Sequence, residues 1–143
     1  MQELANRLYR TALAYLGSVQ EAEDAVQDTF VIFYEKSPQN LKNPAAWLTR
    51  VLVNQCRDRL RSPQRREVPL WEGLPAPGPE EKEELEEMFS LPPEDRTVLH
   101  LFYYEGYSTE EIAAILNVRP GTVRARLSRA RDRLRTLLKG GAE

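Results

Sequence analysis

Hydrophobic residues recur every three or four positions along most of the chain, which is the spacing of one face of an α-helix. Three such runs, at residues 4–16, 19–33 and 44–61, make up the first part of the sequence. Gly17 is suited to end the first run, and Asn43 is suited to cap the third. The apolar line predicted for the third helix consists of Leu48, Leu52, Cys56 and Leu60, with Val51 beside it.

Helical spacing resumes at about residue 81 and continues almost to the end of the chain, with breaks at a proline pair, at Gly106 and at Pro120. Ser108 and Glu111 form a capping-box pattern that opens the helix before the last break. The sequence shows neither the alternation typical of strands nor an internal repeat. The buried pairs predicted before Gly106 are Val98 with Leu99 and Phe102 with Tyr103.

Five prolines within residues 63–80 separate the two helical parts, and a helix does not tolerate that density. We interpret this stretch as an acidic, Pro-rich linker. The sequence therefore predicts an all-α fold of two small helical domains, at residues 1–62 and 81–143, that the linker joins.

The net charge of −2 hides an uneven distribution. Residues 1–62 carry a net charge of +1, residues 63–95 of −7 and residues 96–143 of +4. Seven arginines lie within residues 119–135, and Asp132 is the only acid on the last predicted helix. An ordinary solvated helix face, which is the alternative interpretation, mixes charges of both signs. The basic end of the chain therefore favours a nucleic acid as its partner.

A short apolar helix, a turn and an arginine-rich helix form the helix-turn-helix pattern of DNA-binding proteins. Small Ala113 would let the two helices approach closely. The last helix carries an apolar stripe that we expect to pack inward, formed by Val123, Leu127, Ala130, Leu134 and Leu137/Leu138. Arginine binds guanine edges and phosphates through its planar guanidinium. We expect base contacts from Thr122, Arg124, Ala125, Ser128 and Arg129, and phosphate contacts from Arg131, Arg135, Ser108 and Thr109.

The sequence gives no indication of catalytic chemistry. His100 and Cys56 are the only residues of their types, they lie in different halves, and both fall on predicted apolar helix faces. A Gly-rich phosphate loop and metal-ligand spacing are both missing, so we expect no enzyme, no metal and no cofactor. Because no apolar run is long enough to cross a bilayer and the N-terminus does not resemble a signal peptide, we expect a cytoplasmic protein without membrane insertion.

Three stretches of the sequence carry a resemblance to known proteins. Two lie in the first part, "EAEDAVQDTFVIFY" and "AWLTRVLVNQCRDRLR", and one lies in the second, "LPPEDRTVLHLFYYEGYSTEEIAAILNVRPGTVRARLSRARDRLR". Together they resemble the bacterial RNA polymerase sigma factors of the extracytoplasmic-function type. Both blocks in this order, with a Pro-rich tether between them, are far more specific than a helix-turn-helix alone. The resemblance implies a sigma-2-like first domain and a sigma-4-like second domain.

The resemblance implies that the first domain binds the clamp coiled coil of core RNA polymerase and recognises and melts the minus-ten element. The second would read the minus-thirty-five element of promoter DNA and sit on the polymerase flap, and an anti-sigma factor is implied as a further partner. Asp24, Gln27, Asp28 and Phe30 match the clamp-docking motif. Trp47, Asn54, Arg57, Asp58 and Arg61 match the segment that faces minus-ten DNA, and Gln39, Asn40 and Lys42 are the expected pocket for a flipped base.

Judged from spacing alone, the polar residues of the third helix also fit an ordinary solvated face, and Trp47 fits the core better than a base-stacking position. The chain departs from the family pattern in three ways: we expect the usual upstream helix to be short or absent, the loop before Asn43 is short, and Arg119 replaces a capping serine, which costs about 1 kcal/mol. Two other functions stay open: a free-standing helix-turn-helix regulator, and a truncated sigma-like adaptor that binds polymerase without melting DNA.

Overall fold

A computed structural model of the chain describes residues 2–62, 78 and 86–142, with side chains up to residue 136. The predicted linker lies outside the described residues except for Gly78. The chain divides into two compact units, with the division between residues 74 and 75. The domain boundaries predicted at 62 and 81 therefore stay a prediction.

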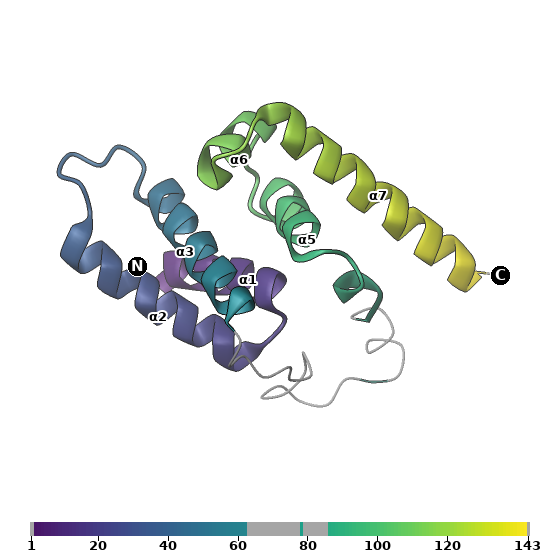
Figure 1. Cartoon of the computed structure of the whole chain (residues 1–143), viewed down its shortest axis with the longest axis horizontal. Helices are drawn as coiled ribbons and strands as arrows, with labels where there is room; N and C mark the ends of the chain where they lie inside the picture. Colours follow the sequence, from purple (N-terminus) through teal and green to yellow (C-terminus); the bar gives the residue numbers. More distant parts are fainter. Residues whose placement is uncertain (1, 63–77, 79–85, 143) are drawn as a thin grey trace. The chain divides into compact units, whose positions relative to one another are not determined.

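Every regular element in the described residues is helical, in agreement with the all-α prediction (Figure 1). Residues 86–89 form a short helical turn ahead of the second unit's main elements. The elements are α1 (Gln2–Leu16), α2 (Val19–Lys36), α3 (Pro44–Arg61), α5 (Pro93–Leu99), the π-helix η1 (His100–Tyr104), α6 (Thr109–Leu116) and α7 (Pro120–Ala142).

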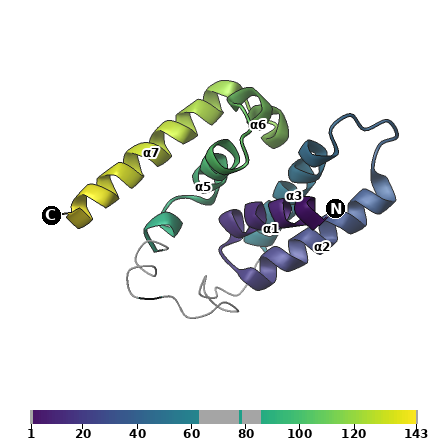
Figure 2. The ribbon, with the colours of Figure 1, turned by 180° about the vertical axis from the view of Figure 1, so that it is seen from behind.

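In the first unit, α1, α2 and α3 each pack against the other two, as the two opposite views show (Figure 2). Gly17 adopts a positive φ of 69° in the turn between α1 and α2, which confirms its predicted role as a helix stop. The Ser18 side chain accepts a hydrogen bond from the Glu21 N–H at the start of α2. The tight turn thus brings α1 and α2 directly against each other.

The buried stripe of α3 is broader than the sequence predicts. Leu48, Leu52 and Cys56 are buried as expected, but Val53 is only 1% exposed, whereas Val51 and Leu60 are half-buried. The reason is that α3 packs on α1 and α2 at once, so it buries two adjacent rows of side chains instead of one line.

In the second unit, α7 packs on both α5 and α6. Gly106 has a φ of 80°, as expected of a helix stop, and the capping box between Ser108 and Glu111 is present with both of its hydrogen bonds. The largest fully buried side chains of this unit are Leu91, Thr97, Val98, Leu101, Ile112, Leu116 and Val123.

The helix that starts at Pro93 changes to π-helical geometry at His100. The Glu105 N–H donates to the His100 carbonyl at 3.1 Å, which closes a wider turn and rotates the residues after Leu99 relative to an α-helix. Leu101 therefore is fully buried, whereas Tyr103 is 59% exposed. The predicted buried pair Val98 and Leu99 is confirmed, but the prediction that Phe102 and Tyr103 are buried is wrong: Phe102 is only half-buried.

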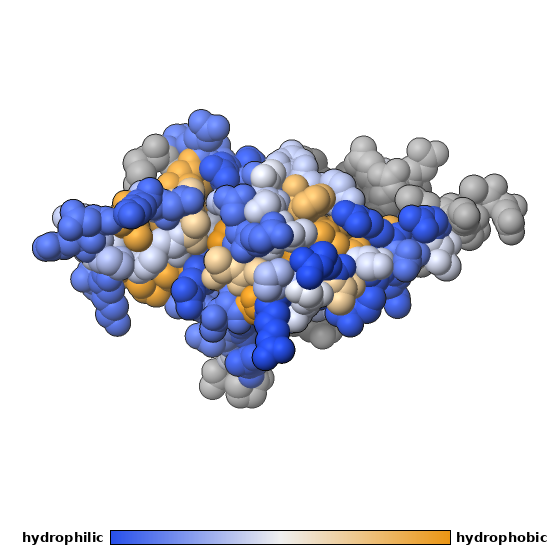
Figure 3. Space-filling model, turned by 90° about the horizontal axis from the view of Figure 1, so that it is seen from above, coloured by the Kyte–Doolittle hydropathy of each residue, from blue (hydrophilic) through white to orange (hydrophobic). Residues whose placement is uncertain are grey.

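Hydrophilic residues cover most of the face seen in Figure 3, with smaller hydrophobic areas between them. Within the described residues, no helix has both the length and the apolar character that a membrane span requires.

Because the π-helical turn buries Leu101 and exposes Tyr104, we expect Leu101 to contribute more to the stability of the second unit. Leu101→Ala should lower its free energy of unfolding by about 2–5 kcal/mol, because the substitution empties a fully buried site. Hydrogen exchange of the α6 and α7 amides in the full chain measures this loss. Tyr104→Leu is the control, with an expected change below about 1 kcal/mol because Tyr104 is 69% exposed. Equal losses from the two variants would contradict this register.

Candidate nucleic-acid interface

The turn between α6 and α7 depends on a left-handed residue. Asn117 has φ 57° and ψ 48°, and the Val118 N–H donates to the Ala113 carbonyl at 3.0 Å. Asparagine tolerates this conformation better than other non-glycine residues, so it ends α6 and redirects the chain into α7. Ala113 is buried at 4% exposure, in agreement with its expected place where the two helices approach.

The first turn of α7 uses the backbone carbonyl of Arg119. This oxygen accepts from the Thr122 N–H at 2.9 Å and from the Val123 N–H at 3.3 Å. Val123, Leu127 and Ala130 are at most 2% exposed, as predicted for the inward stripe, whereas Leu134 of the same stripe is half-buried. The side chains of Leu137 and Leu138 lie outside the described residues. Of the predicted DNA-contacting residues on α7, Thr122 is half-buried, and those exposed are Arg124, Ala125, Ser128, Arg129, Arg131 and Arg135.

Two arginines on one side of α7 are paired with acids of α5. The Arg129 Nη2 atom lies 3.4 Å from Asp95 Oδ1, and the Arg126 Nη1 atom lies 3.5 Å from Glu94 Oε2. All four residues line one groove. Neither acid is predicted from the sequence to be part of this surface, because 34 residues separate Asp95 from its partner and only the packing of α5 on α7 brings them together.

A third arginine, Arg131, is held from η1. Its Nε atom donates to the Tyr103 hydroxyl at 2.5 Å, and its guanidinium lies 5.2 Å from the Tyr103 ring centroid and 5.7 Å from that of Phe102. These distances are typical of cation–π contacts. The π-helical turn is what points Tyr103 outward, so the wrong prediction of a buried Tyr103 also hid this contact.

The N-terminus of α6 is already occupied by its own side chains. Ser108 Oγ accepts from the Glu111 N–H at 3.1 Å, and Thr109 Oγ1 donates to Glu110 Oε2 at 3.1 Å. A backbone hydrogen bond and the bond from Thr109 lower the pKa of Glu110, so its charge persists at this helix end. That charge opposes an approaching phosphate, and the phosphate contacts of Ser108 and Thr109 stay a prediction.

In the first unit, the predicted DNA-facing residues of α3 lie on the side opposite its core. Asn54, Asp58 and Arg61 are exposed, and Arg57 is half-buried. Trp47 is half-buried, and its ring lies 5.9 Å from that of Phe33 at an angle of 56°. This contact joins α2 to α3, so Trp47 contributes to packing while part of its ring still faces solvent.

The loop from Ser37 to Asn43 connects α2 to α3. Gln39, Asn40 and Lys42 are all exposed there, and Asn40 adopts a φ of 63°. Asn43 Oδ1 accepts from the Ala46 N–H at 3.1 Å, which confirms the predicted cap of α3. The three predicted pocket residues thus share one exposed loop, and the role in binding a flipped base stays a prediction.

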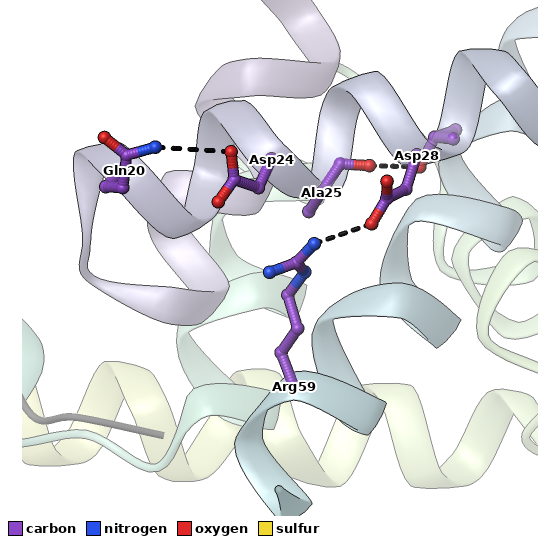
Figure 4. A network of polar contacts seen from close by, with 6 residues as sticks. Gln20, Asp24, Ala25, Asp28 and Arg59 are labelled. Carbon is purple, nitrogen blue, oxygen red and sulfur yellow. Dashed lines mark hydrogen bonds and ion pairs between the residues drawn. The ribbon is translucent and has the colours of Figure 1, made fainter. Parts of the chain in front are cut away.

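The residues that match the clamp-docking motif all belong to α2, and Figure 4 shows two of them, Asp24 and Asp28, with their polar partners. Gln20 donates to Asp24 Oδ1 at 3.3 Å, and Arg59 of α3 donates to Asp28 Oδ2 at 2.6 Å. Gln27 and Asp28 are exposed, while Asp24 and Phe30 are half-buried. This face of α2 therefore presents two carboxylates and an amide beside an aromatic ring, and α3 restrains the second carboxylate.

Cys56 and His100, the only cysteine and the only histidine of the sequence, both make contacts within their own units. Burial raises the pKa of the Cys56 thiol to about 12. His100 Nε2 lies 3.1 Å from Glu105 Oε1, and the His100 ring stacks on that of Tyr104. Among the described residues, no group of three or more His, Cys, Asp or Glu side chains is placed to hold a metal ion.

Two separate parts of the chain match known protein families. Residues 1–67 match the family described as Sigma-70 region 2, and residues 85–134 match Sigma-70, region 4. The chain is 33% identical to the ECF RNA polymerase sigma factor SigW of Bacillus subtilis, over 94% of this chain and 84% of SigW.

The chain belongs to the ECF sigma factors of the sigma-70 family. It is also 33% identical to SigE of Mycolicibacterium smegmatis over 96% of this chain, although it spans only 60% of the length of SigE. The fold is similar to that of the sigma factor RpoE in a co-crystal structure with the anti-sigma factor NepR from Bartonella quintana. The TM-score is 0.77 at 27% identity, over 96% of this chain and 93% of that one.

Membership of this family confirms the resemblance that the sequence showed, and with it the sigma-2-like and sigma-4-like character of the two helical parts. The family is not enzymatic, in agreement with the sequence-based expectation.

The raised pKa of Cys56 predicts an unreactive thiol. At pH 8 the native chain should resist iodoacetamide, because the thiolate is the reactive form, and it should be labelled once guanidinium unfolds it. The free energy of unfolding should also fall as the pH rises from about 9 towards 12, since the unfolded thiol ionises first. Cys56→Ala is the control for both effects. Mass spectrometry should find no label on this variant, and denaturation at several pH values should show that it lacks this part of the pH dependence. Rapid labelling of the native chain would contradict the buried position.

Proposed function

We propose that this chain directs core RNA polymerase to specific promoters and opens the DNA strands there. One observation carries the proposal: a single chain combines a region 2 unit, with polar faces on α2 and α3, and a region 4 unit whose helix-turn-helix exposes an arginine-rich helix. The chain spans less than two thirds of the length of SigE. The proposal therefore rests on the two units of this chain and not on the similarity to SigE.

The first unit, in this proposal, holds polymerase and the minus-ten element on different helices. The α2 face with Asp24, Gln27, Asp28 and Phe30 would contact the clamp coiled coil. The exposed side of α3 and the loop before it would contact promoter DNA. The Arg59–Asp28 ion pair supports this arrangement, because it ties the polymerase-facing helix to the DNA-facing helix within one rigid unit.

The second unit would place the N-terminal half of α7 in the major groove of the minus-thirty-five element. Arg124 and Arg129 would reach base edges, where a guanidinium can bind guanine through two hydrogen bonds. Arg131 and Arg135 would bind phosphates, which position a protein on DNA but carry no sequence information directly. The exposure of these four side chains supports the assignment.

The proposed mechanism consists of binding steps only, and the polymerase supplies the catalysis. Two modest sets of DNA contacts that are held on one polymerase act at a high effective concentration relative to each other. The affinity of the assembly for a promoter therefore exceeds that of either unit for its own element.

An anti-sigma factor belongs to the same proposal. RpoE, whose structure this chain resembles, is bound to the anti-sigma factor NepR in its co-crystal structure. We expect a protein of this class to bind the present chain and to cover the faces that would otherwise contact polymerase.

The decisive experiment measures binding to core RNA polymerase and run-off transcription by the reconstituted complex. We expect a stable complex that starts transcription from promoters selected by that complex out of a random library. DNA binding without any affinity for core polymerase would identify a free-standing regulator and overturn the proposal. Polymerase binding without strand opening, measured by permanganate reactivity of unpaired thymines, would identify an adaptor.

Substitution of a base-reading arginine should reduce the affinity for the selected DNA more than the affinity for other DNA. Arg129→Ala should weaken binding of the full chain, on core polymerase, to a selected upstream element by about 1–3 kcal/mol, with a smaller loss on a scrambled duplex. Arg135→Ala is the matched control. Loss of a phosphate contact should weaken binding to all sequences and lower the slope of log affinity against log salt concentration by about one. An equal loss on both duplexes from Arg129→Ala would reassign this residue to phosphate binding.

A further inference from the structure

A buried carboxylate holds an exposed arginine of the recognition helix. The Asp95 side chain is 8% exposed, whereas that of Arg129 is 67% exposed, and their closest polar atoms lie 3.4 Å apart. Asp95 is in the first turn of α5, so the contact joins the core side of the unit to the side of α7 that carries the predicted base-reading residues.

The position of Asp95 restricts what its carboxylate can do. Burial of a charge is unfavourable unless a partner or helix dipole compensates for it. The α5 N-terminus provides part of that compensation, but a carboxylate at a helix start could equally face solvent. Here the oxygen points to α7, and neighbouring Glu94 makes a parallel contact with Arg126 one turn earlier. Two successive acids thus restrain two arginines of α7.

The restraint leaves most of the Arg129 guanidinium accessible. Its five N–H groups lie in one plane, and the contact with Asp95 involves only the Nη2 atom. An arginine that is held at one edge loses less side-chain freedom when it binds a second partner. Its orientation is also restricted before DNA arrives, which favours bidentate recognition of a base.

The chemical nature of the holding group distinguishes Arg129 from Arg131. A carboxylate holds Arg129 and partly neutralises it, so its attraction to phosphates of any sequence is reduced. A neutral phenol holds Arg131, which leaves the full positive charge for the DNA backbone. The two partners therefore match a base-reading role for Arg129 and a phosphate-binding role for Arg131. Arg135 also lies near a carboxylate, but that of Asp132 is 68% exposed, so water screens it and it neutralises Arg135 less than buried Asp95 neutralises Arg129.

We propose that Asp95 is a positioning residue for promoter recognition, which orients the Arg129 guanidinium towards base edges and weakens its non-specific binding to phosphate. This inference rests on the proposed function, because it assumes that Arg129 reads DNA. Asp95 itself does not touch DNA; its effect passes through the arginine.

The test compares Asp95→Asn with the parent in the full chain bound to core polymerase. The DNA probes are a duplex that the parent complex selects from a random library and a scrambled duplex of the same composition. Asp95→Asn should lower affinity for the selected duplex about five- to tenfold, as expected when a bidentate contact is partly lost. Affinity for the scrambled duplex should stay constant or rise, because one negative charge has been removed.

Two controls separate positioning from charge and from folding. Asp132→Asn removes the same charge from an exposed residue of α7 that pairs with Arg135, and it should leave the ratio of the two affinities unchanged. In an Arg129→Ala background, Asp95→Asn should have no further effect on that ratio. Asp95→Glu keeps the charge but displaces the carboxylate, and it should also lower the ratio, which provides a second variant if Asp95→Asn does not fold.

An unchanged ratio in folded Asp95 variants, or an equal drop with and without Arg129, would overturn the inference and leave the proposed function intact. A parent complex that shows no sequence preference would overturn the proposed function itself. The two failures are therefore distinguishable.

Discussion

The burial of Val123, Leu127 and Ala130 of α7 against α5 and α6 is the contact on which the second unit depends. The same helix supplies core side chains and the arginines proposed to bind DNA, so its rotation about its own axis is set by the core. That rotation decides which arginines face solvent and which reach neighbouring helices. A loss of core packing would therefore disturb DNA recognition even where every arginine is retained.

The sequence does not distinguish the arginines of α7 from one another, but the structure gives them different partners. Arg126 and Arg129 meet carboxylates of α5, Arg131 meets the Tyr103 phenol, and Arg135 lies 3.6 Å from Asp132 on its own helix. A guanidinium beside a carboxylate loses part of its attraction to phosphate, while one beside a phenol does not. The surroundings of each side chain, more than the number of positive charges, determine what this surface can distinguish.

The first unit applies a similar constraint through α3. Leu48, Leu52 and Cys56 anchor α3 on the other two helices, and Arg59 reaches across to Asp28 on α2. An exposed ion pair of this kind adds little stability, about 1 kcal/mol or less. Its value in the proposed function is geometric, since it restrains a carboxylate on the face of α2 that would contact polymerase.

Hydrophobic periodicity and local capping chemistry determined that the described elements are helices and where several of them begin or end, because those signals act over only a few residues. The stop at Gly17, the cap at Asn43 and the capping box at Ser108 are present as the sequence predicted. The motifs in both halves were also enough to indicate the family. Only the tertiary structure decided the rest: the π-helical turn that buries Leu101 and exposes Tyr103, and the pairing of Asp95 with Arg129. The pairing depends on how α5 packs against α7, and a contact between residues 34 positions apart leaves no periodic trace in the sequence.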